Sequence, residues 1–220
     1  MTKLAILFSG RIDRFDEHYT NIMSNIVQTN EVDFFISTIC SDTQLEHFCS
    51  LYKPKGICND EINYDQYKHY ECNKYHMTNF HNMMCMHIHR MRVYQEMELY
   101  SNTTNTKYDL VISMRLDAYS DSVLDIVGPV QEEADVVYIP NGYDWGGVND
   151  QMALGNIQSM KVYMNLYQDI ETWIQVQNFG PETILKNYLD AHNMNIIRFD
   201  FKYRLINGKF YKHYTDPIVL

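Results

Sequence analysis

Residues 108–119 of this 220-residue chain read Tyr-Asp-Leu-Val-Ile-Ser-Met-Arg-Leu-Asp-Ala-Tyr. The apolar run Tyr108–Met114 predicts a strand buried on both faces, which is typical of a parallel sheet covered by helices. Arg115 and Asp117 follow this run directly, so we expect both side chains at the C-terminal end of the strand. Ligands of open α/β sheets collect at that edge. The stretch therefore predicts an α/β fold with a ligand site at one edge of its sheet.

Strand and helix patterns alternate along the rest of the chain. Strands are predicted at Lys3–Ser9, Val32–Thr38, Tyr108–Met114, Val136–Pro140, Gln151–Gly155 and Asn195–Phe201. Helices are predicted between Asp16 as N-cap and Asn30, between Asp42 as N-cap and Pro54, and over Thr78–Tyr100, Ser159–Gln168 and Pro181–His192. Residues 59–76 are predicted to form a loop over the sheet edge, and Asn102–Thr106 a polar break. This alternation predicts one Rossmann-like domain over residues 1–220, with a mixed, mostly parallel sheet flanked by helices.

The composition excludes several classes of partner. The chain has 28 acidic and 18 basic residues, a net charge of −10 and a sequence pI near 5.3. It therefore lacks the basic surface that attracts nucleic acid or an anionic bilayer. No apolar run approaches the roughly 18–20 residues of a membrane span. The apolar run Leu4–Phe8 is too short for a signal peptide, and no small-residue cleavage site follows it. With an odd number of cysteines, five, this favours reduced thiols in a cytoplasmic protein.

Arg115 and Asp117 have the chemistry of a diphosphate site. A carboxylate at a strand end can hold Mg²⁺ or Mn²⁺, which usually bind through one or two carboxylates and the phosphates of a substrate. A guanidinium can grip a diphosphate through paired hydrogen bonds. The simpler interpretation is that Asp117 caps a turn and pairs with Arg115.

Two further stretches carry candidate site residues. Residues 142–155 read Gly-Tyr-Asp-Trp-Gly-Gly-Val-Asn-Asp-Gln-Met-Ala-Leu-Gly, in which Gly146-Gly147 allow a flexible loop and Trp145 offers a surface for stacking. The simpler interpretation is a glycine turn with an Asx cap leading into a strand. Gly10-Arg11 follow the first strand, where nucleotides commonly bind, although they do not form a GxGxxG motif.

These motifs occur in one order that resembles a known family. Strand-Ser-Gly-Arg, Phe-Phe-Ile-Ser-Thr, Tyr-Asp-Leu-Val-Ile-Ser-Met-Arg-Leu-Asp, Val-Asn-Asp-Gln-Met-Ala-Leu-Gly and Pro-Glu-Thr-Ile-Leu-Lys-Asn-Tyr-Leu follow one another over about residues 4–205. The chain is similar to the small GT-A-fold glycosyltransferases of surface-polysaccharide clusters and large DNA viruses. The resemblance implies hexosyl transfer from a nucleotide sugar, usually a UDP-sugar with Mn²⁺ or Mg²⁺, to a hydroxyl of a glycan acceptor.

The resemblance assigns donor-side roles by position. Asp117 matches the last acid of the family's Asp-x-Asp metal motif, whereas Arg115 stands where the first acid would be. This departure weakens the expected metal site, and Arg115 would partly replace the metal by neutralising the diphosphate. The remaining donor-side residues are expected on the nucleotide loop and near the uracil: Ser9, Gly10, Arg11 and Thr38.

The resemblance also assigns acceptor-side carboxylates. Asp150 matches a position where such enzymes hold an acidic side chain, and Glu182 matches the acid that begins the late helix. A carboxylate there would take the acceptor proton in an inverting reaction, and Asp150 is the first candidate. A retaining reaction needs no such fixed base and remains an alternative. For Glu182 the simpler interpretation is a favourable interaction with the helix dipole.

Other functions remain open. A non-catalytic nucleotide-sugar or carbohydrate-binding module is the main alternative, supported by Arg115 in place of an acid. A methyltransferase is disfavoured because no glycine-rich loop follows the first strand. A zinc site at His81, Cys85 and His89 is also disfavoured, because three ligands at i, i+4 and i+8 along one helix rise too steeply to converge on a single ion.

Overall fold

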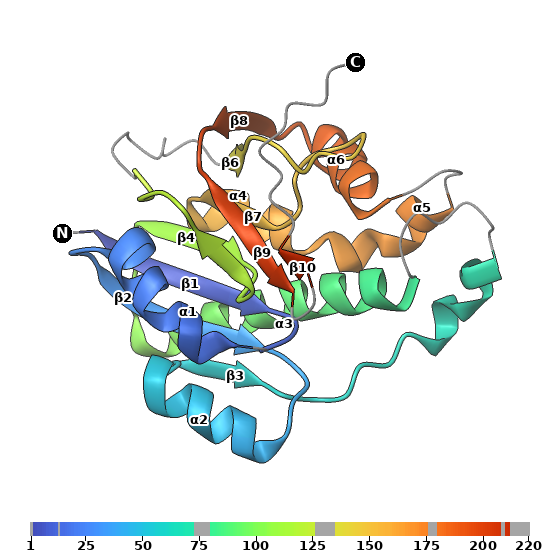
Figure 1. Cartoon of the computed structure of the whole chain (residues 1–220). Helices are drawn as coiled ribbons and strands as arrows, with labels where there is room; N and C mark the ends of the chain where they lie inside the picture. The colour runs from blue at the N-terminus through green and yellow to red at the C-terminus, as the bar shows by residue number, and fades with distance from the viewer. Residues whose placement is uncertain are drawn as a thin grey trace.

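The computed structural model describes residues 2–12, 14–72, 80–125, 135–175, 180–207 and 210–211. Its main sheet has seven strands in the order β3-β2-β1-β4-β7-β6-β8 (Figure 1). Only β7 runs antiparallel to its neighbours in this sheet. The predicted mixed, mostly parallel α/β sheet is therefore confirmed. The strands are β1 (Lys3–Ser9), β2 (Glu31–Ser37), β3 (Gly56–Cys58), β4 (Leu110–Met114), β6 (Val136–Pro140), β7 (Met152–Gly155) and β8 (Asn195–Phe199).

Helices cover both faces of this sheet (Figure 1). Along β1, Leu4, Ile6 and Phe8 pack with α1 and α2, whereas Ala5 and Leu7 pack on the α3 side. This alternation follows from the two-residue repeat of a strand. The helices are α1 (Phe15–Ile22), α2 (Asp42–Tyr52), α3 (Phe80–Thr104), α4 (Ile157–Met164), α5 (Ile170–Ile174) and α6 (Pro181–Ala191), with a π-helical turn at Met23–Val27 and 3₁₀ turns at Asp65–Cys72 and Leu166–Asp169.

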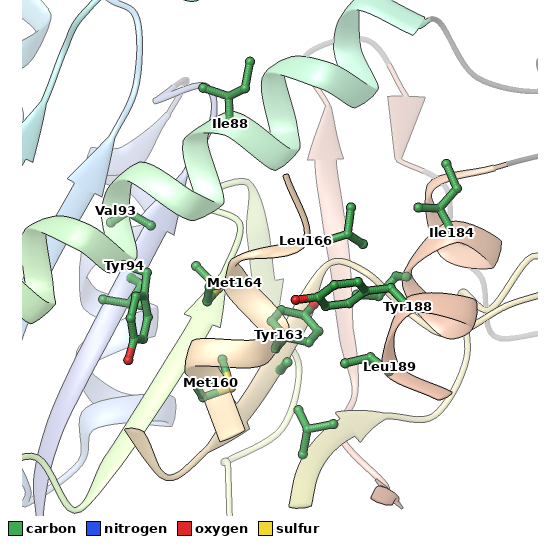
Figure 2. Packing of buried hydrophobic residues seen from close by; sticks show 14 of the residues in the cluster. Ile88, Val93, Tyr94, Met160, Tyr163, Met164, Leu166, Ile184, Tyr188 and Leu189 are labelled. Atoms are coloured by element: carbon green, nitrogen blue, oxygen red, sulfur yellow. The ribbon is translucent and has the colours of Figure 1, made fainter. Parts of the chain in front are cut away.

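The α3 face of the sheet holds the helices that surround the candidate site. Figure 2 shows side chains of α3, α4 and α6 packing together, including Tyr94, Tyr163 and Tyr188. The Tyr94 hydroxyl donates to the carbonyl of Ile157, and the Tyr188 hydroxyl donates to that of Val162. These bonds let large aromatic residues lie in the core with their polar atoms satisfied. They also fix α4 against α3 and α6.

A small antiparallel sheet was not predicted from the sequence. It has the order β10-β9-β5, from β5 (Ala118–Ser120), β9 (Tyr203–Asn207) and β10 (Phe210–Tyr211). The strand β5 has three residues and pairs with a segment far along the chain, so no local pattern marks it. It begins directly after Asp117, whose carbonyl accepts a hydrogen bond from the amide of Ile206. This sheet therefore holds the segment that follows the Arg-x-Asp stretch.

Several predicted helix ends are wrong by a few residues. Ser41, not Asp42, caps α2, because its hydroxyl accepts from the amide of Gln44 in a capping box. The helix α1 begins at Phe15, so Asp16 lies in its first turn. The helix α3 continues through part of the predicted polar break at 102–106, where Thr103 and Thr104 donate to carbonyls one turn earlier. Of the predicted 59–76 loop and Thr78–Tyr100 helix, residues 73–79 lie outside the described residues. No helix in the described part of the chain is long and apolar enough to cross a membrane.

Candidate functional site

Strand register brings the predicted site residues to one edge of the sheet. Ser9 pairs with Ser37, Phe8 pairs with Met114, and Met114 pairs with Met152. Because β7 runs antiparallel, the residues before it lie at the edge where the parallel strands end. Gly10, Arg115 and Asp150 therefore follow or precede neighbouring strands, which are about 4.8 Å apart in a sheet. The predicted site residues thus lie in one row along this edge of the sheet.

The β1–β2 part of this edge holds a pocket. The pocket has a volume of about 280 Å³ and is lined by residues after β1, after β2 and in the first turn of α2: Arg11, Ile12, Ile39, Cys40 and Gln44. Gly10 directly precedes the lining residue Arg11; its φ of +101° suits glycine, and its amide donates to the carbonyl of Ser37. This volume approaches the range of small-molecule sites. Its lining combines an exposed guanidinium, an amide and apolar surface.

Three of the predicted nucleotide-side residues, Ser9, Gly10 and Thr38, do not line this pocket. Thr38 is fully buried, and its hydroxyl has no hydrogen-bond partner among the described residues. Its amide donates to the carbonyl of Cys58, which fixes the end of β2. Ser9 is half-buried at the end of β1. The pocket is instead formed by Ile39 and by Arg11, the only predicted donor-side residue among its lining.

Arg115 and Asp117 form a closely paired unit. Arg115 donates through Nε to Asp117 Oδ1 at 2.7 Å and through Nη2 to Oδ2 at 2.6 Å. The Arg115 side chain is 40% exposed and that of Asp117 is 17% exposed. The Arg115 amide also lies 3.3 Å from the carbonyl of Gln151. The guanidinium is thus held in place by Asp117 while part of it faces solvent, as in the simpler interpretation of the sequence.

This pair fits a divalent metal poorly. Both carboxylate oxygens of Asp117 already accept a hydrogen bond from Arg115, so a metal ion would have to share these oxygens with a second cation. Across the described ranges, no group of three or more His, Cys, Asp or Glu side chains is arranged to hold a metal ion. A magnesium or manganese ion usually needs oxygen ligands with open lone pairs. The assignment of Asp117 as a metal ligand therefore stays a prediction that its hydrogen bonding does not favour.

Asp150 is buried beside an arginine that the sequence did not indicate. Asp150 is 6% exposed and Arg90 of α3 is 3% exposed. Arg90 Nη2 lies 3.7 Å from Asp150 Oδ2, and the guanidinium lies over the Tyr163 ring at 5.7 Å. Within the described residues, Arg90 Nη1 has no hydrogen-bond partner. A buried carboxylate needs a compensating charge, and the Arg90 guanidinium supplies one to Asp150.

Glu182 lies near this buried pair at the start of α6. Burial, followed by the negative charge of Asp150, raises the pKa of Glu182 to about 7, although Arg90 partly opposes this effect. Glu182 is more exposed than Asp150. The fold thus brings the two predicted carboxylates together, although they are distant in the sequence. At neutral pH one of them can exchange a proton readily.

The loop between β6 and β7 is fastened to α6 at one glycine. A Cβ added at Gly147 would lie 2.0 Å from the carbonyl oxygen of Glu182, so only glycine fits there. The Val148 amide donates to the same carbonyl at 3.1 Å. Asp144 Oδ1 accepts from the amide of Asn149 and from Arg198 Nη2. These contacts hold the loop against the helix that carries Glu182.

Sequence reasoning missed the side chains that support the two carboxylates. Arg90 lies on the buried face of α3, between His87 and Tyr94 at helical spacing. A charged residue at a position where the period predicts an apolar one was the available signal. Tyr203 gave no such signal. Its hydroxyl accepts from Asn149 Nδ2 at 2.9 Å and donates to Gln151 Oε1 at 3.1 Å, which fixes both sides of Asp150.

Of the three residues considered for zinc, His81 and Cys85 contact each other, whereas His89 has a different partner. His81 Nδ1 lies 2.5 Å from the Tyr64 hydroxyl, and Cys85 Sγ lies 3.6 Å from His81 Nε2. His89 instead contacts the Ser37 hydroxyl through Nδ1 at 2.9 Å. Burial and the charge of Arg92 lower the pKa of His89 to about 4. His89 is therefore bonded to a buried residue of β2 and does not share a site with His81.

Comparison with solved structures identifies the fold. The galactosyltransferase LgtC in complex with donor and acceptor sugar analogues aligns with a TM-score of 0.52 at 11% identity, over 88% of this chain and 72% of that one. The apo-form glycosyltransferase GlyE of Streptococcus pneumoniae TIGR4 aligns with a TM-score of 0.49 at 9% identity, over 90% of this chain, which spans 45% of GlyE. A glycosyltransferase involved in glycosylation of the major capsid of PBCV-1 gives 0.41 at 10% identity, over 90% and 81%.

Sequence comparison gives a family without a described function. No curated protein matches the chain. A family described as "Domain of unknown function (DUF7796)" matches residues 91–217, which is more than half of the chain and includes β4, the β6–β7 loop and α6. The likeness to LgtC confirms the expected GT-A fold. The chain therefore belongs to the DUF7796 family and has the fold of the GT-A glycosyltransferases.

Proposed function

We propose that this protein is a glycosyltransferase that moves a sugar from a nucleotide sugar to a hydroxyl group of a glycan or glycoconjugate. The observation that carries the proposal is the row of groups at the sheet edge. Along this edge lie, in order, a pocket at β1–β2, the Arg115 guanidinium after β4, and the carboxylates of Asp150 before β7 and Glu182 at the start of α6. A base-and-ribose group, a diphosphate, a sugar and an acceptor hydroxyl would occupy such a row in that order.

The donor would bind from β1 to β4. The pocket beside Arg11 suits a nucleobase and ribose, since it joins apolar surface to hydrogen-bonding groups. Arg115 would bind the diphosphate through the N–H groups that Asp117 leaves open. As the bond between sugar and diphosphate breaks, negative charge grows on the leaving group, and a preorganised guanidinium stabilises it. The UDP-sugar expected from the resemblance is the first donor to test.

Glu182 is the better placed of the two carboxylates to act as the base. It is more exposed than Asp150 and its pKa is raised to about 7, close to the value that suits a general base. Asp150 is buried and paired with Arg90, so we assign it two roles: binding the donor sugar and balancing the charge of Arg90. The order of the two candidates is thus reversed from the sequence-based expectation.

The proposed reaction is a single displacement. The acceptor oxygen attacks the anomeric carbon while its proton moves to Glu182. The bond from that carbon to the diphosphate breaks, and the nucleoside diphosphate leaves with the electron pair. The product has the inverted anomeric configuration. If the reaction is retaining instead, Glu182 would not be needed as a base.

A donor screen tests the proposal. The protein is incubated with UDP-, GDP- and dTDP-linked sugars, and both the thermal shift and the release of nucleoside diphosphate are measured, with and without Mn²⁺. We expect one donor class to stabilise the protein and to be turned over. Binding without release, even with a panel of acceptors, would favour the non-catalytic nucleotide-sugar-binding module. If the protein neither binds any of these donors nor releases nucleoside diphosphate from them, the proposal is contradicted.

A further inference from the structure

The β6–β7 loop presents an unusual backbone beside Glu182. Tyr143 and Trp145 have φ values of +58° and +40°, and Gly142 and Gly146 have +88° and +86°. The left-handed region is unfavourable for side chains larger than glycine. Two aromatic residues are nevertheless held in it. Backbone strain of this kind persists only where surrounding contacts impose it, and it is common at ligand sites.

Contacts on both sides of Trp145 impose this conformation. Before it, the Tyr143 hydroxyl donates to the carbonyl of Tyr203, and Asp144 accepts from Arg198. After it, the Gly147 amide donates to the carbonyl of Asp144 at 2.6 Å, which closes a tight turn around Trp145. Gly147 itself lies against the backbone of Glu182. Trp145 is thus at the tip of a turn fixed to α6.

The Trp145 side chain is 50% exposed, although its backbone is fixed. Large aromatic residues are usually buried or packed at an interface. The exposed part of the Trp145 indole, on a turn with a fixed backbone, is therefore accessible to a ligand. The faces of sugar rings carry C–H groups that stack on flat aromatic surfaces. The nucleotide pocket lies across β1, β4 and β7 from this turn, so a nucleobase would bind elsewhere.

We propose that Trp145 is the platform on which a sugar ring of the acceptor stacks, next to Glu182. This proposal rests on the proposed glycosyl transfer and names the acceptor side of the same site. The acceptor would therefore be a carbohydrate rather than a protein side chain or a lipid headgroup. A platform fixed through Gly147 to the residue that takes the proton would also orient the reacting hydroxyl.

Kinetic variants test the platform. Trp145→Ala should raise the acceptor KM by about tenfold or more, as expected for loss of one well-packed aromatic contact. Trp145→Phe should recover much of this loss. Donor Kd should stay near the wild-type value, because the platform is proposed for the acceptor and not for the donor. Trp173→Phe is the matched control, because Trp173 of α5 packs on Tyr188 and lies outside the site. Equal acceptor kcat/KM in wild type and Trp145→Ala would overturn the proposal.

Fluorescence gives a readout that does not need catalysis. The chain has two tryptophans, so Trp145 is the only one left in Trp173→Phe. Methyl glycosides of glucose, galactose, mannose, N-acetylglucosamine and N-acetylgalactosamine are titrated against this variant. At least one should shift or quench the emission saturably. If none does and none is accepted, the platform is wrong. Should the donor screen fail while a glycoside still changes the emission, the transferase proposal fails and the platform remains.

Discussion

At the scale of single residues, Asp150 and Glu182 carry the same functional group in two different environments. Asp150 is buried and compensated by Arg90, whereas burial and the nearby charge of Asp150 raise the pKa of Glu182 to about 7. A carboxyl group with a pKa near 7, such as that of Glu182, can exchange a proton at neutral pH. A carboxyl group whose pKa is raised by burial beside a second carboxylate is typical of acid–base sites.

Replacement of Glu182 should therefore affect turnover. Glu182→Gln should lower kcat by about 10²–10⁴-fold with little change in donor Kd, because a base acts only in the transition state. The base must be deprotonated, so kcat/KM of the wild type should rise with pH through about 7. Steady-state kinetics from pH 5.5 to 8.5 measure both effects. Asp150→Asn is the paired variant: the opposite ranking would make Asp150 the base, and retained activity in both would favour a retaining reaction.

The Arg115–Asp117 pair leads to a prediction about metal. Arg115→Ala should weaken donor binding by about tenfold or more, since it removes the charge proposed for the diphosphate. It also frees both oxygens of Asp117, so Mn²⁺ should stimulate this variant more than the wild type. Calorimetry with the donor, with and without Mn²⁺, measures this difference. A wild type that loses all donor binding in EDTA would show that Asp117 serves a metal despite its pairing.

At the scale of elements, one close approach joins the β6–β7 loop to α6. Gly147 has no room for a side chain against the Glu182 carbonyl, and the clash is with backbone, which cannot rotate away. The loop and the helix must therefore move together. This contact places Asp144, Trp145 and Glu182 in fixed relation.

Gly147→Ala should separate the loop from the helix. Overpacking of this kind typically costs about 1–3 kcal/mol, so the variant should unfold at a lower temperature and lose transfer activity. Gly142→Ala is the control, because nothing lies within 4 Å of its added Cβ and only its φ of +88° is unfavourable. Thermal unfolding and kinetics compare the two. Wild-type activity in Gly147→Ala would mean that the contact does not support the site.

At the scale of the whole molecule, the free energy of unfolding depends on the charge of Glu182. Its pKa is raised in the folded state, so the folded protein holds this proton more tightly than the unfolded chain. The resulting contribution disfavours folding as pH rises from about 4.5 to about 7. Glu182→Gln should remove it, so its stability relative to the wild type should increase over this window. Urea unfolding at pH 5 and pH 8 measures the difference, and a constant difference would contradict the raised pKa.

Stability should not depend on zinc. His89 is bonded to Ser37 inside the fold, away from the His81–Cys85 contact, so the three do not share an ion. We expect the melting temperature to be the same before and after EDTA treatment, without nucleotide present. A fall of several degrees would reveal a structural metal, and metal analysis of the purified protein would identify it.

The sequence alone determined much of the architecture. Buried strands, their order of occurrence and the placement of Arg115, Asp117 and Asp150 at strand ends follow from local hydrophobic patterns. Those patterns reflect burial and backbone period, which act over a few residues. The GT-A fold was expected from a different source, the resemblance of the ordered motifs to those of small GT-A glycosyltransferases.

Only the tertiary structure decided how the site is built. The contact of Arg90 with Asp150, the approach of Gly147 to Glu182, and the pairing of β5 with β9 join segments that are far apart in the sequence. Thr38, which the family resemblance had placed near the nucleobase, is likewise fully buried. Such contacts depend on how packed elements cross and on which charges burial can tolerate. No local pattern encodes them, because each requires both partners to be placed in space.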